Sequence, residues 1–389
     1  MIFLILLLCL APLHAQTYTP GETYFGKDSL IEYQAGNIPL IISVPHGGHL
    51  TPANLPDRNC EGCVYGTDVS TQELAREIRD AFARQTGCYP HMVYNRLHRK
   101  KLDMNRDSIT ATDSNSITGD YWRNYHDFID SAKARILTLN GKGLFIDLHG
   151  HGHTKQRTEF GYLLTKTNLL ESDSAVNTSK RINVSSVKNL VGTNRGGLSH
   201  AELIRGEKAL GTLFANRGYP GVPSMQDPFP LTDDDYFNGG YNTYEYGSRL
   251  GGTIDAIQME LYSAIRTNAT QRAAFADDFA TVLRAYLQEH YFPEFNQYSC
   301  QSTSVPPRYA DDVRLYPNPA SDYILINGDD ESTQAYTLRI VDMLGRPTVA
   351  DENITLPVQI DVSPLPSGSY HVLLISTTGS MISRTIVVL

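Results

Sequence analysis

The centre of this 389-residue chain is the stretch Gly143-Leu-Phe-Ile-Asp-Leu-His-Gly-His-Gly-His153. Its first half is a nearly continuous apolar run, which is typical of a strand buried on both faces in a parallel sheet. The run then ends in an aspartate and three histidines. Open α/β sheets bind ligands outside the carboxyl ends of their strands. Asp147 and His149 therefore lie where a metal ligand and its carboxylate neighbour are expected, with a hydrogen-bonded surface histidine as the ordinary alternative.

The composition is that of an ordinary globular protein, with 41% hydrophobic and 19% charged residues. A chain of 389 residues is longer than a single hydrophobic core usually supports, so two domains are expected. The net charge of −9 argues against a nucleic-acid partner. The richest basic stretch, residues 96–106, is interrupted by Asp103. That interruption indicates a site rather than a phosphate-binding stripe.

Residues 1–15 have the pattern of a secretory signal peptide, with cleavage expected after Ala15. Their apolar core is too short to span a bilayer, and no second stretch of spanning length follows, so no transmembrane segment is expected after cleavage. Four cysteines then remain, an even number that suits an oxidising compartment: Cys60, Cys63, Cys88 and Cys300. Disulfides are favoured over a zinc site at the first two, because no second pair of that spacing exists. The pairing stays open.

Strand and helix patterns alternate along residues 38–290, as a doubly wound α/β domain with a mostly parallel sheet requires. Buried strands are predicted at residues 38–44, 91–94, 143–149 and 253–262. Amphipathic helices are predicted at residues 71–85, 121–139 and 270–290. Two capping boxes predict helix starts, at Ser70 with Glu73 and at Ser199 with Glu202.

Three of these segments carry polar residues that suit a site. The first strand stops at Pro45-His46-Gly-Gly48, where two glycines allow close approach of the backbone. Asp68 lies just before a helix start, where capping and the helix dipole are its ordinary explanation. Glu260 lies within a predicted buried strand, where an acid is costly unless it has a partner or a task.

The composition changes after residue 298. Residues 299–312 are rich in Ser, Thr and Pro and are predicted to be a linker. Residues 313–389 contain short strand patterns at the spacing of a small all-β sandwich, without a constellation of His, Asp and Glu. This part is not expected to do chemistry, which assigns the catalytic domain to residues 16–298.

Six motifs follow one another along residues 37–290: Val44-Pro-His-Gly-Gly48, Gly66-Thr-Asp68, Leu102-Asp-Met-Asn-Arg106, Asp147-Leu-His149, Asn238-Gly-Gly-Tyr-Asn-Thr-Tyr-Glu-Tyr-Gly247 and Gln258-Met-Glu260. In this order they resemble the N-formylglutamate amidohydrolase family. The resemblance implies a hydrolase with one zinc ion that cleaves an amide, and a fold of the zinc-carboxypeptidase and aminoacylase type.

The C-terminal part carries a second resemblance. Leu315-Tyr-Pro-Asn-Pro-Ala-Ser-Asp322, Leu344-Gly345 and Leu365-Pro-Ser-Gly-Ser-Tyr370 resemble the C-terminal sorting domain of the type IX secretion system. The resemblance implies that the secretion machinery is a partner and that the protein is secreted or displayed on the cell surface.

Within the first resemblance, His46 and His149 match the two histidine ligands of such zinc sites. The third position departs from carboxypeptidase-like relatives, which place a glutamate three residues after the first histidine, where this chain has His49. Asp68 is preferred as the third ligand, because formylglutamate-type relatives keep an acid there, and His49 stays its rival. The two later histidines of the central stretch can assist, although the glycines beside them leave their direction open.

The resemblance also assigns catalytic roles. Glu260 matches the glutamate that acts as general base, with an ion pair to Arg266 as the structural alternative. Arg99 is placed to stabilise the oxyanion, and Arg96 is its close rival.

Substrate binding is predicted for three further residues. Asn105 and Arg106 resemble the pair that grips the substrate carboxylate in carboxypeptidase-like sites, with a structural ion pair of Arg106 to Asp103 or Asp107 as the alternative. Tyr241 is expected to close over the substrate, with a core tyrosine as the alternative.

One departure bears on the substrate. Relatives that act on formylglutamate usually read Gly-Gly-Tyr-Ile-Thr-Arg where this chain has Gly239-Gly-Tyr-Asn-Thr-Tyr244, so a carboxylate-binding arginine is missing. Together with export, this favours an extracellular N-acyl amino acid or small peptide over formylglutamate. A secreted binding protein that keeps the fold without turnover is the rival function, and a surface-structural protein is a third.

Overall fold

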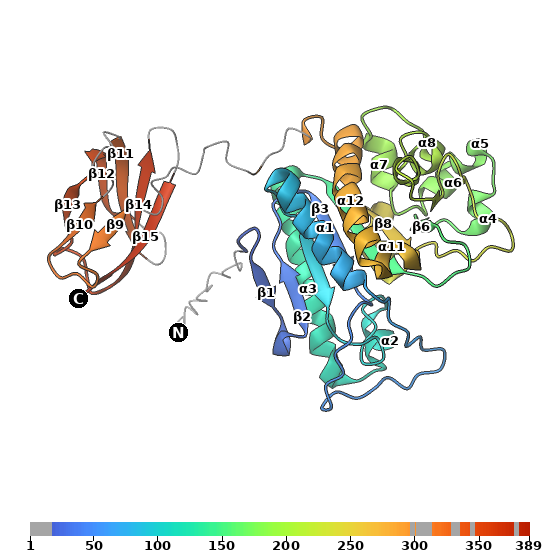
Figure 1. Cartoon of the computed structure of the whole chain (residues 1–389), viewed down its shortest axis with the longest axis horizontal. Helices are drawn as coiled ribbons and strands as arrows, with labels where there is room; N and C mark the ends of the chain where they lie inside the picture. The colour runs from blue at the N-terminus through green and yellow to red at the C-terminus, as the bar shows by residue number, and fades with distance from the viewer. Residues whose placement is uncertain (1–17, 296–299, 301–312, 328–334, 343–346, 377–380) are drawn as a thin grey trace, which may run out of the picture. The chain divides into compact units, whose positions relative to one another are not determined.

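The computed structural model describes residues 18–295, 300, 313–327, 335–342, 347–376 and 381–389 (Figure 1). The chain divides into two compact units, Met1–Cys300 and Gln301–Leu389. The predicted signal peptide lies outside the described residues, as does the predicted linker apart from Cys300.

The first unit is built on one eight-stranded sheet with the order β1-β2-β4-β3-β5-β8-β6-β7. Its four central strands, β4, β3, β5 and β8, run parallel to one another. The strands are β1 Thr23–Phe25, β2 Ile31–Gln34, β3 Leu40–Val44, β4 His91–Asn95, β5 Gly143–Gly150, β6 Thr158–Gly161, β7 Gly221–Val222 and β8 Ile254–Leu261. The prediction of an α/β domain with a mostly parallel sheet is confirmed.

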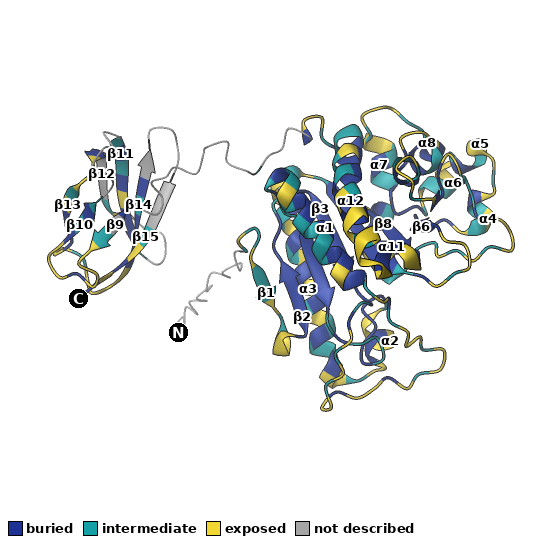
Figure 2. Ribbon diagram, in the orientation of Figure 1, coloured by how far each residue is buried: buried dark blue, intermediate teal, exposed yellow. Residues whose placement is uncertain are grey.

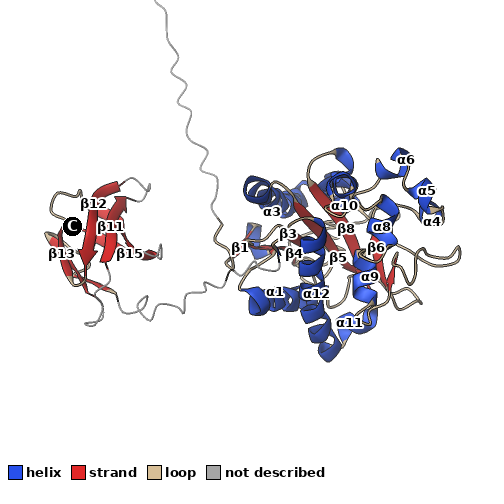
Figure 3. Ribbon diagram, turned by 90° about the horizontal axis from the view of Figure 1, so that it is seen from above, coloured by secondary structure: helices blue, strands red, loops and turns tan. Residues whose placement is uncertain are grey.

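Helices cover both faces of this sheet, as Figure 3 shows from above. Helices α1 (Thr71–Thr86) and α12 (Ala269–His290) pack on one face, and α3 (Ser116–Asn140) and α10 (Tyr241–Tyr246) pack on the other. The remaining helices are short: α2 Ser108–Thr112, α4 Lys166–Leu169, α5 Asp173–Val176, α6 Ser179–Ile182, α7 Lys188–Thr193, α8 His200–Arg205, α9 Leu210–Ala215 and α11 Ser263–Thr267, with the 3₁₀ turns Lys27–Ser29 and Ser248–Leu250.

The two cores explain why the central strands are apolar at nearly every position. In β5, Leu144 and Ile146 enter the core under α1 and α12, whereas Phe145 enters the core under α3. Successive side chains of a strand point to opposite faces, so Asp147 and His149 lie on the same side as Phe145. Figure 2 shows these strands as buried. The polar residues of the site therefore extend from the sheet face that α3 and α10 cover.

One predicted capping box is absent and the other is confirmed, although α1 begins at Thr71 as predicted. Ser70 precedes α1 in a left-handed conformation, with φ of 62°, and its side chain makes no capping hydrogen bond. The carbonyl of Asp68 instead accepts hydrogen bonds from the backbone and the hydroxyl of Thr71. The chain turns sharply here, which directs the Asp68 side chain toward the site. Ser199 and Glu202 form the predicted capping box at α8.

The four cysteines form two disulfides, Cys60–Cys63 and Cys88–Cys300. The first closes a short loop before α1, and the second joins the end of α1 to the last described residue of the first unit. The structure therefore shows a disulfide at Cys60 and Cys63 rather than half of a zinc site.

The second unit consists of two antiparallel sheets. One has the order β13-β10-β9 and the other the order β12-β11-β14-β15. Both contribute to a single hydrophobic core, as Ile324, Leu338 and Val372 illustrate. The strands are β9 Arg314–Tyr316, β10 Tyr323–Asn327, β11 Ala335–Asp342, β12 Pro347–Thr355, β13 Val358–Asp361, β14 Gly368–Ser376 and β15 Met381–Val388. The predicted small all-β sandwich is confirmed.

Stability of the first unit is expected to fall in mild acid because of His91. Its Nδ1 accepts the backbone N–H of Gly36 at 3.1 Å and lies 2.7 Å from the Tyr33 hydroxyl. Burial, helped by the charge of Arg135, lowers the pKa of His91 to about 3. In the unfolded chain a histidine has a pKa of about 6.5, so between the two pKa values the unfolded chain binds more protons than the folded one. The free energy of unfolding therefore falls by up to about 1.4 kcal/mol for each unit by which the pH is lowered.

The His91→Asn variant keeps an acceptor for Gly36 and does not titrate, so its loss of stability between pH 7 and pH 5 should be smaller than that of the parent. Urea unfolding at both pH values measures the difference. Equal losses in the two proteins would show that His91 is not the cause.

Candidate metal centre

The sequence-predicted ligands meet at the carboxyl ends of the central strands. His46 follows β3, His149 lies near the end of β5, and Glu260 lies near the end of β8, directly beside His149 in the ladder. Asp68 reaches the same place from the loop before α1. Gly48 is needed beyond β3, because a Cβ atom there would collide with the carbonyl oxygen of Leu97.

His149 is held between carboxylates. Its Nε2 lies 2.9 Å from Asp147 Oδ2, and its Nδ1 lies 3.1 Å from both His46 Nδ1 and Asp68 Oδ2. A carboxylate only accepts hydrogen bonds, so Nε2 donates to Asp147. Asp147 is itself fixed by Ser43 Oγ and by Asn242 Nδ2, which lies 3.2 Å away. The Nδ1 atom is thereby aimed at the other two candidate ligands.

His46 is oriented in the same manner. Its Nε2 donates to Asp103 Oδ1 at 2.7 Å, and its Nδ1 lies 3.5 Å from Asp68 Oδ2. Asp103 also accepts hydrogen bonds from Arg99 Nε at 2.9 Å and from the backbone N–H of Asn105 at 3.1 Å. Burial opposes ionisation of Asp103, but the charge and hydrogen bond of His46 and the charge of Arg99 hold its pKa well below the ordinary value.

The donor set fits a zinc ion. His46, Asp68 and His149 form a group that could hold a metal ion, and the three donor atoms are separated by 3.1, 3.1 and 3.5 Å. A tetrahedral zinc ion with ligands at about 2.0–2.1 Å separates its ligand atoms by about 3.3 Å. Metal-binding histidines also usually donate their outer N–H to a carboxylate or carbonyl, as both do here. The rival ligand His49 is exposed and lies outside this group.

The electrostatics of the site favour a positive charge among these ligands. Burial opposes protonation of His149, but the charges of Asp147 and Glu260 and the hydrogen bonds to Asp147 and Asp68 raise its pKa well above the ordinary value. For Asp68, burial is likewise outweighed by hydrogen bonds and charges of the two histidines, which lower its pKa strongly. Without a metal, a proton on His149 supplies the charge that a cation would supply.

Glu260 is a buried acid that makes no ion pair with a described residue. Gln258 Nε2 donates to its Oε1 at 3.0 Å. Burial raises the pKa of Glu260 to about 8, although the charge of His149 opposes the rise. Arg266, the predicted structural partner, donates instead to the backbone carbonyls of Leu261, Val69 and His151. Glu260 is therefore not held by Arg266.

A cavity of about 190 Å³ opens onto these groups. Glu260, Arg99, Asn105 and Arg106 all line it together with the three candidate ligands. Arg106 donates to the carbonyl of Asn105 at 2.8 Å and makes no ion pair with a described residue, while Asp107 caps α2. The structural ion pair considered for Arg106 is thus not formed.

Two predicted residues lie outside the residues that line this cavity. Tyr241 packs with Trp122 and His126, at ring-centroid distances of 6.4 and 5.8 Å. Arg96, the rival of Arg99, donates to the carbonyl of Ser29 at 2.7 Å. Arg99 lines the cavity, whereas Arg96 does not.

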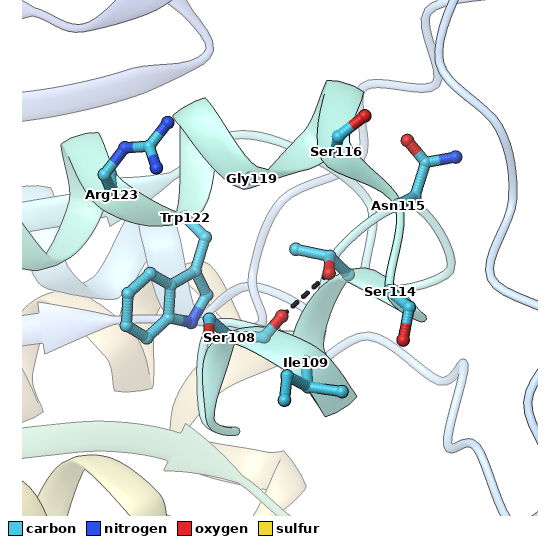
Figure 4. A pocket seen from close by; sticks show the side chains of 9 residues that line it. Ser108, Ile109, Ser114, Asn115, Ser116, Gly119, Trp122 and Arg123 are labelled. Atoms are coloured by element: carbon cyan, nitrogen blue, oxygen red, sulfur yellow. Dashed lines mark hydrogen bonds between the residues drawn. The ribbon is translucent and has the colours of Figure 1, made fainter.

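A second, more open hollow of about 510 Å³ lies between α2 and the start of α3 (Figure 4). Trp122 forms part of its wall, and the Trp122 indole N–H donates to the carbonyl of Arg106 at 3.0 Å. Its other lining residues are mostly small and polar, and none of the predicted site residues is among them. Trp122 thus supports the loop that carries Arg106, and the lining of the hollow includes no residue predicted to act in catalysis or metal binding.

Four residues of the cavity received no role from the sequence, although three of them lie in the quoted motifs. Phe237, Gly239, Gly240 and Gln258 line it. A Cβ atom at Gly240 would collide with the Asn105 amide, so a larger residue there would push that side chain aside. The paired glycines were visible within a motif, whereas nothing in the sequence pattern marked Phe237.

The comparisons with known proteins gave one matching family model and similar solved structures. Residues 314–388 match the family model of the secretion system C-terminal sorting domain. Among solved structures, the chain is similar to N-formylglutamate amidohydrolase from Ralstonia eutropha JMP134, with 13% identity and a TM-score of 0.42; the match covers 67% of this chain and 97% of that one. A gene product from Agrobacterium tumefaciens matches with 12% identity and a TM-score of 0.39, over 68% and 98% of the two chains.

No curated protein matches the chain significantly. Within the part of the chain that the structure describes, no helix is long and apolar enough to cross a membrane.

Asp68 and His49 can be separated by metal analysis. The Asp68→Ala variant is expected to lose the bound ion because it removes one of three converging donors, whereas His49→Ala should retain it because His49 is exposed. Zinc content after equilibrium dialysis, with circular dichroism as the check on folding, measures both. Retention of zinc by Asp68→Ala together with its loss in His49→Ala would reverse the assignment.

Proposed function

We propose that this chain is an exported, zinc-dependent amidohydrolase that cleaves the amide of an N-acyl amino acid or small peptide. The observation that carries the proposal is the position of Glu260, a buried acid that lines the same small cavity as His46, Asp68 and His149. A protein that only binds a ligand has no need of such an acid, and an unpaired buried acid is costly to keep.

His46, Asp68 and His149 would hold the zinc ion. When bound, zinc supplies Lewis acidity and lowers the pKa of water to about 7. Asp103 and Asp147 keep the two imidazole rings in the orientation and tautomer that binding requires.

Glu260 is the proposed general base. It takes a proton from the water that attacks the amide carbon and passes this proton to the leaving nitrogen. Gln258 engages one oxygen of Glu260, which leaves the other for the water. Arg99 is proposed to stabilise the negative charge on the carbonyl oxygen. Its Nε is fixed by Asp103, and its Nη atoms make no hydrogen bond to a described residue.

The walls of the cavity support a substrate with a free carboxylate. Arg106 and Asn105 line it, and Arg106 has no acidic partner among the described residues. An arginine guanidinium suits bidentate recognition of a carboxylate. Phe237, a residue that is 45% exposed, adds an apolar surface to the same cavity. We therefore favour an N-acyl amino acid over a neutral amide.

Export is part of the proposal. Residues 1–15 are the proposed signal peptide, and residues 313–389 the proposed sorting domain that engages the type IX secretion machinery, with residues 16–298 as the catalytic domain. A secreted, non-catalytic binding protein with the same fold is the second candidate. Its support is the absence of the arginine that formylglutamate-type relatives carry at the position of Tyr244.

The Glu260→Gln variant separates the enzyme from the binding protein. It keeps the shape of the side chain but removes the base, so zinc should stay bound while kcat falls by about 10²- to 10⁴-fold. Turnover of a panel of N-acyl amino acids and zinc content measure the two effects. Glu207→Gln, at an exposed position of the same unit, is the matched control. Unchanged turnover in Glu260→Gln would assign Glu260 to structure.

Carboxylate recognition can be tested on Arg106. A hydrogen bond to a charged group contributes about 1.5–3 kcal/mol, so Arg106→Ala should lower kcat/KM by about ten- to a hundredfold for a free-acid substrate. The amide counterpart should be a poor substrate that the variant barely affects. Arg96→Ala, outside the cavity, is the control. Equal losses on the acid and the amide would show that Arg106 supports the fold.

A further inference from the structure

A second cluster of metal-binding side chains lies beside the site described above. It consists of His151, His153 and Glu159, and one donor atom from each lies within 4.8 Å of the others. None of these residues has a role in the proposed hydrolysis. They come from the extension of β5 and from the start of β6, two segments joined by a short loop.

The strand register separates the two clusters. Glu260 on β8 is the direct ladder partner of His149 on β5 and of Glu159 on β6. Side chains of directly paired residues lie on the same face of a sheet. Glu260 therefore stands between the first candidate site, to which His149 belongs, and the second cluster, to which Glu159 belongs.

The second cluster contains a buried acid, Glu159, that pairs with no described lysine or arginine. Glu159 is only 1% exposed. The nearest arginine in sequence, Arg157, is paired with Asp227 and Asp234. The ion-pair partner that the structure gives Glu159 is His153, whose Nδ1 lies 2.8 Å from Glu159 Oε1. A buried carboxylate next to another buried acid, Glu260, is costly unless positive charge is supplied.

The ring of His151 is oriented as a metal ligand would be. Its Nε2 lies 2.8 Å from the carbonyl of Arg157, so it donates there, and its Nδ1 accepts the backbone N–H of His153 at 3.1 Å. The ring is therefore neutral, and its one free lone pair, on Nδ1, would bind the ion in place of the His153 N–H. An outer hydrogen bond to a backbone carbonyl is the usual support of a metal-binding histidine.

We propose that His151, His153 and Glu159 form a second site for a divalent metal ion, of which Zn²⁺ is the best match. Two imidazoles and one carboxylate form a donor set that binds zinc with an open fourth position. On binding, the cation would take the place of the hydrogen bond between His153 Nδ1 and Glu159 Oε1, since metal ligands must be deprotonated.

The second ion would act on the cavity through Phe237. The backbone N–H of Phe237 donates to Glu159 Oε2 at 2.7 Å, and its ring stacks on His153 with centroids 4.6 Å apart. Phe237 lines the cavity of the first site. The second site is thus a positioning site, which fixes an apolar wall of the cavity.

The test uses the full chain with the first site disabled by His46→Ala and His149→Ala. Zinc content after equilibrium dialysis, and the rise in Tm on adding Zn²⁺, are measured for this background and for the same protein with Glu159→Gln added. The background should bind one zinc ion and show the rise in Tm, and the added substitution should abolish both. Glutamine keeps an acceptor for Phe237 N–H, so folding should survive. Glu207→Gln added to the background is the matched control and should change neither.

The outcomes distinguish the two sites. If the parent binds one ion and the folded background binds none, the first site stands and the second is overturned. If the parent binds one ion that the background retains and Glu159→Gln removes, the second site stands and the first fails. An ion that persists in the background with Glu159→Gln lies elsewhere and overturns this inference. If Glu159→Gln unfolds, His153→Gln takes its place, and zinc content decides in the same way.

Discussion

The hydrogen bonds between buried carboxylates and the outer nitrogens of His46 and His149 determine the rest of the site. Each histidine has two nitrogens that could face the cavity. Asp103 and Asp147 each bind the Nε2 atom of one ring, and because a carboxylate can only accept, they leave both Nδ1 atoms directed at Asp68. The converging donor set therefore depends on two acids that are not part of it.

The buried carboxylates of Asp103 and Asp147 need hydrogen-bond donors, and the segments that supply these donors also form the cavity. Asp147 is held by Ser43 and Asn242, which brings the start of α10 against the sheet. Asp103 is held by Arg99 and by the backbone of Asn105, which folds the loop after β4 over the carboxyl ends of the strands. The arginines and the amide that line the cavity are thus placed by the same interactions that orient the ligands.

Acidic side chains on neighbouring strands of the sheet make a positive charge favourable at the site. Glu260 and Glu159 are neighbours on adjacent strands, and Asp147 and Asp68 flank His149 on the other side. His149 supplies compensating charge, because the charges of Asp147 and Glu260 and its hydrogen bonds to Asp147 and Asp68 raise its pKa although the ring is buried. A cation at either cluster would take over this role.

The sequence alone determined the α/β sheet, because apolar residues on both faces of a strand leave a pattern that no surface segment shows. It also placed His46, His149 and Glu260 at the site, since parallel strands align their carboxyl ends. Only the tertiary structure gave the disulfide pairing and the role of Asp103, which lies 57 residues from His46. It alone also placed Phe237 at the cavity and Tyr241 outside it. Sequence periodicity shows which face of an element is buried, but it carries no information about which distant side chain meets that face.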